Sequence, residues 1–358
     1  MLETTWFFLA ALPLVAYTVL DGFDLGVGIL HLRVARTDAE RKQVLASIGP
    51  IWDGNEVWLV VAGATLFLAF PVLFGVAFSG FYLPLTLVLW LLVFRALGIE
   101  LRHLLPHKLF NTFWDASFTG ASALLAFALG AALGNVVRGV SLDEQGQFFA
   151  PLWTDLWWPA PGAAGQTGVL DVYTALTGLT AVVVLALHGA LWLAHRVDGV
   201  VAERAQQDAR RLLVASGVLV VALTGATLWV QPNLSVNVAR YPAGLLAPGA
   251  GLASLVLLSV SARAGHWQRA FRASAAWITA LLASAAYAVF PYVLTARDPA
   301  RSLHLMDAAN DAATLTTALY WWIPGVLLGA GYCVVGYRLL PPIAALAPPE
   351  DFQAPLDT

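Results

Sequence analysis

The sequence is poor in the residues that metal binding and soluble chemistry depend on. Its 358 residues include one cysteine, Cys333, which excludes an internal disulfide and a cysteine-ligated zinc or iron–sulfur site within one chain. The two methionines, Met1 and Met306, both lie outside the cores of the expected helices. Only 11% of the residues are charged, against about a quarter in a soluble globular domain. No basic tract indicates nucleic-acid binding, and no phosphate-loop, dinucleotide-binding or HExxH motif is present.

Long apolar runs take the place of these residues. The chain is 59% hydrophobic with a mean hydropathy of +0.74, which predicts an all-α polytopic membrane protein. No Lys or Arg precedes the first apolar run and no small-residue cleavage pattern follows it, so we expect a permanent helix there rather than a signal peptide. Nine runs have the length of about 20 residues that a transmembrane helix needs. The predicted spans are 6–31, 53–74, 79–101, 115–137, 168–194, 211–231, 243–262, 273–294 and 315–340.

Lys and Arg predict the orientation of these nine helices. Fourteen of them fall in the connections after the odd-numbered helices, and four fall on the opposite side. The positive-inside rule therefore places the N-terminus outside and the C-terminus in the cytoplasm. The connection 139–167 would lie outside, where its tryptophans are typical of headgroup anchors, with a lid or a partner contact as the alternative. The Pro-rich tail 341–358 is predicted to be disordered.

Acidic residues inside or at the ends of the helices are the most informative feature. They are Asp21, Asp24, Asp53, Glu56, Glu100 and Asp115. An ionisable group in hydrocarbon costs several kcal/mol unless it is paired, hydrated or neutralised. Asp21 and Asp24 are three residues apart and share one face of a glycine-rich helix. All six lie toward the predicted cytoplasmic side, which favours a proton or ion path over a lipid-facing wall.

Simpler roles stay open for several of these residues. Asp115 fits an acid in the first turn of a helix at the interface. Glu56 could be solvated or paired with an arginine of a loop, and Arg95 could pair with Asp21 or Asp24 to hold helices together. Asp21, Asp24 and Asp53 are harder to explain in this way. A buried acid without a partner is held protonated, and such a group near water can pass protons on.

Histidine is too scarce inside the helices for haem ligation by this chain alone. A bis-histidine site needs two facing histidines within the membrane, and only His188 lies well inside a predicted helix. We therefore expect His188 to be a packed, hydrogen-bonded core residue, and we expect neither haem nor metal to be ligated here.

Four segments resemble subunit II of the cytochrome bd-type quinol oxidases of prokaryotes. They are DGFDLGVG at 21–28, GPIWDGNEVWL at 49–59, AFSGFY at 77–82 and FRALGIELR at 94–102. The resemblance implies two four-helix bundles plus one peripheral helix. The first bundle would occupy 1–138 and the second 168–294, with a loop and the ninth helix at 295–340.

The resemblance also implies a function. The family pairs with a haem-bearing subunit I, in which quinol is oxidised and O2 is reduced to water at two b-type haems and one d-type haem. Subunit II ligates no haem, braces its partner and is proposed to conduct cytoplasmic protons. The matching path residues here are Asp21, Asp24, Asp53 and Glu100, with Arg95, Glu56, Trp52, Asn55 and Trp58 in support. A structural quinone, a small single-helix subunit and the prokaryotic cytoplasmic membrane complete the expectation.

Two other functions fit the same composition. A proton- or cation-coupled secondary transporter also buries acids near glycines, but it needs broken helices in corresponding halves of the chain at the membrane midplane. The acids lie too far to one side for that arrangement. A purely structural scaffold, whose acids merely pair with the partner, is the third hypothesis.

Overall fold

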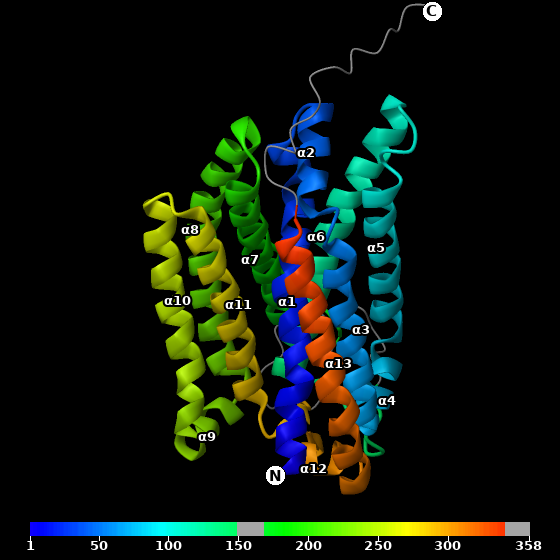
Figure 1. Cartoon of the computed structure of the whole chain (residues 1–358). Coiled ribbons are helices and arrows are strands. Elements are labelled where there is room, and N and C mark those ends of the chain that lie inside the picture. The colour runs from blue at the N-terminus through cyan, green and yellow to red at the C-terminus, as the bar shows by residue number, and fades with distance from the viewer. Residues whose placement is uncertain (149–167, 341–358) are drawn as a thin grey trace, which may run out of the picture.

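A computed structural model describes residues 1–148 and 168–340, which form long helices lying side by side (Figure 1). The N-terminus and the last turn of α13 (Ala312–Arg338) lie at opposite ends of the helices in this view. The elements are α1 (Leu2–Val34), α2 (Asp38–Ile48), α3 (Trp52–Ala69), α4 (Pro71–Gly80), α5 (Tyr82–Glu100), α6 (Lys108–Arg138), α7 (Val172–Arg196), α8 (Gly199–Val230), α9 (Asn233–Arg240), η1 (Pro242–Leu245), α10 (Leu246–Arg263), α11 (Trp267–Val289), β1 (Tyr292–Leu294), η2 (Pro299–Arg301), β2 (Leu303–His304), α12 (Leu305–Ala308) and α13 (Ala312–Arg338).

Helix α1 lies at the centre, in contact with α3, α6 and α7. Glycine makes this approach possible. A Cβ on Gly26 would lie 1.9 Å from the carbonyl oxygen of Leu185 in α7, and one on Gly189 would lie 2.3 Å from the backbone of Gly26. Small residues of this kind let membrane helices pack backbone against backbone. The polar face of α1 is therefore enclosed by protein on several sides.

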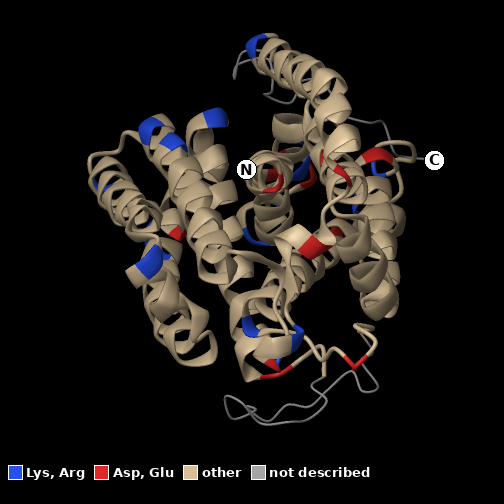
Figure 2. Ribbon diagram, turned by 90° about the horizontal axis from the view of Figure 1, so that it is seen from below, with Lys and Arg blue, Asp and Glu red and all other residues tan. Residues whose placement is uncertain are grey.

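The outer helices present apolar side chains outward, such as Val221 of α8 at 74% exposure and Leu328 of α13 at 76%. Eight described helical segments are long and apolar enough to cross a membrane. Figure 2, viewed along the helices, shows how sparse Lys, Arg, Asp and Glu are on the ribbon. These observations confirm an all-α polytopic membrane protein. The ninth span and the orientation stay predictions.

Two predicted helix boundaries were wrong, and proline explains both. The second span was expected as one helix over 53–74, but α3 ends at Ala69 and α4 begins at Pro71. Proline lacks an amide donor, so it begins a helix more readily than it continues one. The eighth span was expected to reach 294, but α11 ends at Val289, just before Pro291. Residues Tyr292–Leu294 instead form strand β1, antiparallel to β2.

Helices also extend beyond the apolar runs. Helix α8 begins at Gly199 rather than 211, and α6 begins at Lys108 rather than 115. Short α2 was expected as part of a connection. Hydropathy marks only the part of a helix that lies in lipid, so it leaves these polar turns out. Residues 149–167 and the tail 341–358 lie outside the described residues, so the anchor and disorder predictions made for them stay predictions.

Candidate functional site

Arg95 is the centre of one buried polar cluster. Its Nη2 donates to Asp21 Oδ1 at 2.5 Å, and its Nη1 donates to Asp21 Oδ2 at 3.0 Å and to Glu56 Oε2 at 3.3 Å. Arg95 and Asp21 are fully buried, and the guanidinium carbon lies 6.0 Å from the ring centroid of Trp52. A two-pronged arginine–carboxylate contact is the strong geometry for such a pair. We call Asp21, Glu56 and Arg95 the Arg95 cluster; it joins α1, α3 and α5.

Asp24 lies one turn beyond Asp21 and has a different partner. Asn55 Nδ2 donates to Asp24 Oδ2 at 2.8 Å, and Tyr337 donates its hydroxyl to Asn55 Oδ1 at 3.0 Å. The other carboxyl oxygen of Asp24 is buried without a hydrogen-bond partner in the described residues. Two carboxyl groups, those of Asp21 and Glu56, therefore contact one guanidinium, and that of Asp24 lies one helical turn away.

The structure does not bring all predicted path residues together. Asp53 and Glu100 are exposed, and neither makes a hydrogen bond or ion pair within residues 1–148 and 168–340. Trp58 donates its indole N–H to Cys333 Sγ at 3.4 Å, on the side of α13. The expectation that Arg95 pairs with Asp21 is confirmed. The alternative that Glu56 pairs with a loop arginine was wrong, because its cation is Arg95 within α5.

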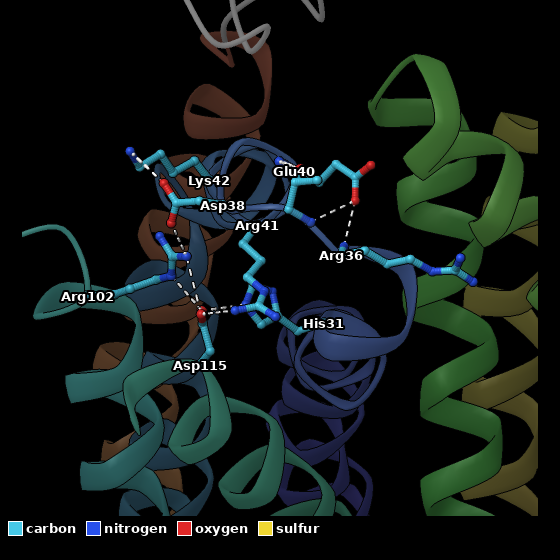
Figure 3. Close-up of polar contacts among 9 residues, drawn as sticks. His31, Arg36, Asp38, Glu40, Arg41, Lys42, Arg102 and Asp115 are labelled. Carbon is cyan, nitrogen blue, oxygen red and sulfur yellow. Dashed lines mark hydrogen bonds and ion pairs between the residues drawn. The ribbon is translucent and has the colours of Figure 1, made fainter. Parts of the chain in front are cut away.

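A second buried cluster surrounds Asp115 and was missed (Figure 3). His31 Nε2 donates to Asp115 Oδ1 at 2.8 Å, Arg102 Nε donates to the same oxygen at 2.5 Å, and Arg41 Nη1 donates to Asp115 Oδ2 at 3.0 Å. Arg102 also reaches Asp38 of α2 at 2.8 Å. We call His31, Arg41, Arg102 and Asp115 the Asp115 cluster. The prediction that Asp115 opens a helix at the interface was wrong, since α6 begins at Lys108 and Asp115 is 1% exposed.

The sequence held two signals for this cluster. His31 follows Asp24 and Gly28 at helical spacing, so the three share one face of α1. Thr37 and Glu40 form the S/T-x-x-E capping box that starts α2, and Arg204 of α8 donates to Glu40 Oε2 at 2.9 Å. Helix α2 is thus fixed to both halves of the chain.

Comparison with known proteins decides the family. The family model for cytochrome bd terminal oxidase subunit II matches residues 2–340. The chain belongs to that family.

Two curated relatives and one solved structure agree with this assignment. Cytochrome bd-I ubiquinol oxidase subunit 2 of Escherichia coli K12 is 28% identical, over 93% of each chain. A probable cytochrome oxidase subunit 2 of Haemophilus influenzae is 26% identical, over 94% of this chain and 93% of the relative. The bd oxidase structure from Geobacillus thermodenitrificans superimposes with a TM-score of 0.74 at 16% identity, over 94% of this chain and 98% of that one, and so supports the fold. This subunit II is therefore a multi-pass protein of the bacterial inner membrane and part of an oxidoreductase complex.

His188 of this subunit II is the packed core histidine that was predicted. Its Nδ1 is hydrogen-bonded to Ser274 at 2.6 Å and its Nε2 to the carbonyl of Val19 at 3.1 Å, and its ring stacks on Phe271 with centroids 4.6 Å apart. In the described part of the chain, no three His, Cys, Asp or Glu side chains gather as a metal site.

A largely apolar groove of about 340 Å³ runs between α3 and α13 of this subunit II. Trp58 and Thr65 line one wall, and Trp322, Gly329 and Cys333 line the other. Trp322 donates its indole N–H to Thr65 at 2.9 Å, which closes one end of the groove with a polar contact.

Proposed function

We propose that this chain is the non-haem subunit of a bd-type terminal oxidase that couples quinol oxidation to the reduction of O2 to water. In this proposal it braces a haem-bearing subunit I, which holds two b-type haems and one d-type haem, and it conducts cytoplasmic protons toward the haem that reduces O2. A small single-helix subunit is a further expected partner. The chain catalyses nothing by itself. Its N-terminus lies outside and its C-terminus lies in the cytoplasm. Helix α3, in the second predicted span, crosses the membrane in addition to the eight long apolar segments.

The main support for this proposal is the number of carboxyl groups in and beside the Arg95 cluster. A bracing contact needs one acid for one arginine, and the Asp21–Arg95 pair already provides this. Glu56 and Asp24 add two carboxyl groups in the same buried region, one of them with an oxygen that lacks a partner. Buried charge without compensation is costly, so surplus carboxyl groups hold protons or exchange them. An excess of carboxyl groups beside a single arginine suits proton transfer better than a purely structural contact.

The two exposed acids fit the cytoplasmic entrance of the proposed route. Glu100 ends α5 and Asp53 begins α3, where the helix dipole favours a carboxylate. In this arrangement protons enter from cytoplasmic water at Glu100 or Asp53, and Asp24 and Asp21 then pass them toward the partner subunit.

The test replaces each acid by its amide in the assembled oxidase. We expect Asp53→Asn and Asp24→Asn to slow quinol-dependent O2 uptake by about tenfold or more while haem content stays normal, since loss of a proton-transfer group typically costs at least that. Asp198→Asn and Glu203→Gln are matched controls, because both acids are exposed at α8 away from the cluster. Wild-type turnover in both path variants would end the proposal, and loss of haem would indicate a structural role.

The expected structural quinone has one suitable location. The groove between α3 and α13 is largely apolar, which suits an isoprenoid chain. We expect Gly329→Leu, which fills the groove, to lower the quinone that co-purifies with the oxidase, as measured by mass spectrometry of extracted lipid. Unchanged quinone content would remove the groove from the proposal.

A further inference from the structure

Between the two polar clusters, three buried polar atoms have no hydrogen-bond partner in the described residues. They are Asp24 Oδ1, Ser122 Oγ and His31 Nδ1. All three side chains are fully buried. An unsatisfied buried polar group costs about 1–3 kcal/mol, so native proteins rarely leave several together without water. Their grouping marks the boundary between α1 and α6 as a place where ordered water is expected.

These atoms follow one another along α1. Asp24, Gly28 and His31 share a face of the helix, and Ser122 of α6 lies opposite Gly28. A Cβ on Gly28 would lie 2.1 Å from Ser122 Oγ, so only glycine leaves room for that hydroxyl. We call Asp24, Gly28, His31 and Ser122 the α1–α6 seam. It runs from the Asp115 cluster at one end to the Arg95 cluster at the other.

The spacing along the seam suits a short chain of water molecules. Three residues of helix from His31 to Gly28 rise about 4.5 Å, and four from Gly28 to Asp24 rise about 6 Å. One water that makes two hydrogen bonds of about 2.8 Å joins atoms up to about 5.6 Å apart, so the longer step needs two waters. The ring of Phe118 packs edge-on to His31, with centroids 5.4 Å apart, which keeps the seam narrow.

The cytoplasmic end of the seam also reaches water. The side chain of Arg41 is 25% exposed, and its Nε is another buried donor without a partner in the described residues. Arg41 and His31 both contact Asp115, so the partly exposed arginine joins the histidine to the surface without Asp53 or Glu100.

We propose that waters held by Ser122 connect His31 to Asp24, so that His31 passes cytoplasmic protons into the Arg95 cluster. This inference rests on the proposed function and names an entrance for it. Neutral His31 accepts a proton at Nδ1 and becomes an imidazolium, which the carboxylate of Asp115 stabilises through Nε2. The Nδ1–H bond then breaks toward the first seam water, each oxygen in line passes on one proton, and the last O–H bond forms on Asp24 Oδ1. His31 returns to its neutral state.

The test uses the assembled oxidase with Ser122→Ala and His31→Gln. Alanine removes the hydroxyl that holds water, while glutamine can keep a hydrogen bond to Asp115 but cannot take up a proton. We expect each to slow single-turnover proton uptake from the cytoplasmic side by about tenfold, with haem content and thermal stability near normal. Ser216→Ala of α8 and His188→Gln are the matched controls, being a buried serine and a buried histidine outside the seam. Both controls should take up protons at the parent rate.

Two outcomes separate this inference from the proposed function. If Asp24→Asn slows proton uptake while Ser122→Ala does not, the entrance through the seam is wrong and the function of Asp24 stands. If Asp24→Asn also takes up protons normally, the proposed function fails as well. A high-resolution structure of the oxidase gives a readout independent of activity. Ordered water that joins Ser122 to His31 and to Asp24 would support the inference. Absence of water there would overturn the inference, even where His31→Gln fails to assemble.

Discussion

The two buried clusters have opposite charge balances. The Arg95 cluster sets one guanidinium against Asp21 and Glu56, with Asp24 one turn away. The Asp115 cluster sets one carboxylate against Arg102, Arg41 and the imidazole of His31. Carboxyl groups outnumber guanidinium groups in the Arg95 cluster, and cationic side chains outnumber carboxylates in the Asp115 cluster. In the proposed function the first cluster exchanges protons, whereas the second holds one carboxylate among several cations.

The central ion pairs of the two clusters differ in their further partners. Arg95 and Asp21 are both fully buried, with partly exposed Glu56 as the second acid, while Arg102 of the Asp115 cluster also pairs with Asp38, whose side chain is 54% exposed. Desolvation of an ion pair costs several kcal/mol per charge, so the Asp21–Arg95 pair depends wholly on its internal contact. The second can lose a contact and recover part of it from solvent. On this comparison we propose that the carboxyl groups of the Arg95 cluster exchange protons, and that the Asp115 cluster attaches α2 and holds His31 at the entrance of the seam.

The largest expected effect comes from removing the central cation. Arg95→Leu leaves the buried carboxylate of Asp21 without its partner, and breaking such a pair costs about 3–5 kcal/mol. We expect the variant oxidase to assemble poorly and to unfold at a lower temperature, measured by yield of the purified complex and by thermal unfolding followed through haem absorbance.

A double variant sharpens this test. Arg95→Leu combined with Asp21→Leu removes both charges, and it should regain much of the lost stability because no charge is left unpaired. Equal instability of the single and double variants would show that packing, rather than charge, holds α1 to α5.

Loss of the Asp115 carboxylate should lower the stability of the protein less than loss of Arg95 does. Asp115→Asn removes the carboxylate that accepts hydrogen bonds from both Arg102 and Arg41. We expect this to lower the free energy of unfolding by about 2–3 kcal/mol, the scale of hydrogen bonds to a charged group. The loss is smaller than for Arg95 because Arg102 keeps Asp38 and Arg41 keeps contact with water. We expect faster proteolysis in the connection that holds α2, measured by limited digestion in detergent. A loss as large as that of Arg95→Leu would contradict the comparison.

Much of the Arg95 cluster follows from the sequence alone. Acids three residues apart in an apolar helix must share a face, and a lone intramembrane arginine is expected to pair with one of them. The exposure of Asp53 and Glu100 does not follow, because it depends on how α3 and α5 rotate about their axes. Hydropathy fixes where a helix lies in the membrane but says little about that rotation.

The Asp115 cluster was missed because its members are distant in sequence. His31 and Asp115 are 84 residues apart, and no local pattern joins them. The stripe of Asp24, Gly28 and His31 was readable, yet a histidine near a helix end has a simpler explanation at the interface. The break at Pro71 was likewise present in the sequence, but proline inside an apolar run is tolerated often enough in membranes that a continuous helix was the natural prediction.

The smallest expected effect concerns pH at the outer edge of the Asp115 cluster. Burial raises the pKa of Asp38, but hydrogen bonds from Lys42 and Arg102 outweigh it and leave the pKa below its usual value of 3.8. A lowered folded-state pKa contributes stability that is present above the unfolded value and is lost as the pH falls through the folded value. The side chain is 54% exposed, so solvent screening limits this contribution to less than about 1 kcal/mol.

Hydrogen exchange of the α2 amides can detect a change of this size. Between about pH 4 and pH 7 the parent should protect α2 at a constant level, and protection should fall as acid protonates Asp38. Asp38→Asn should show the weaker protection already at neutral pH, because the amide cannot form the charged contacts with Lys42 and Arg102, and the parent should approach it in acid. Glu203→Gln, an exposed acid on α8, should leave α2 unchanged. If Asp38→Asn matched the parent at neutral pH, α2 would be held by its capping box and by Arg204 alone, and attachment of α2 could no longer be assigned to the Asp115 cluster.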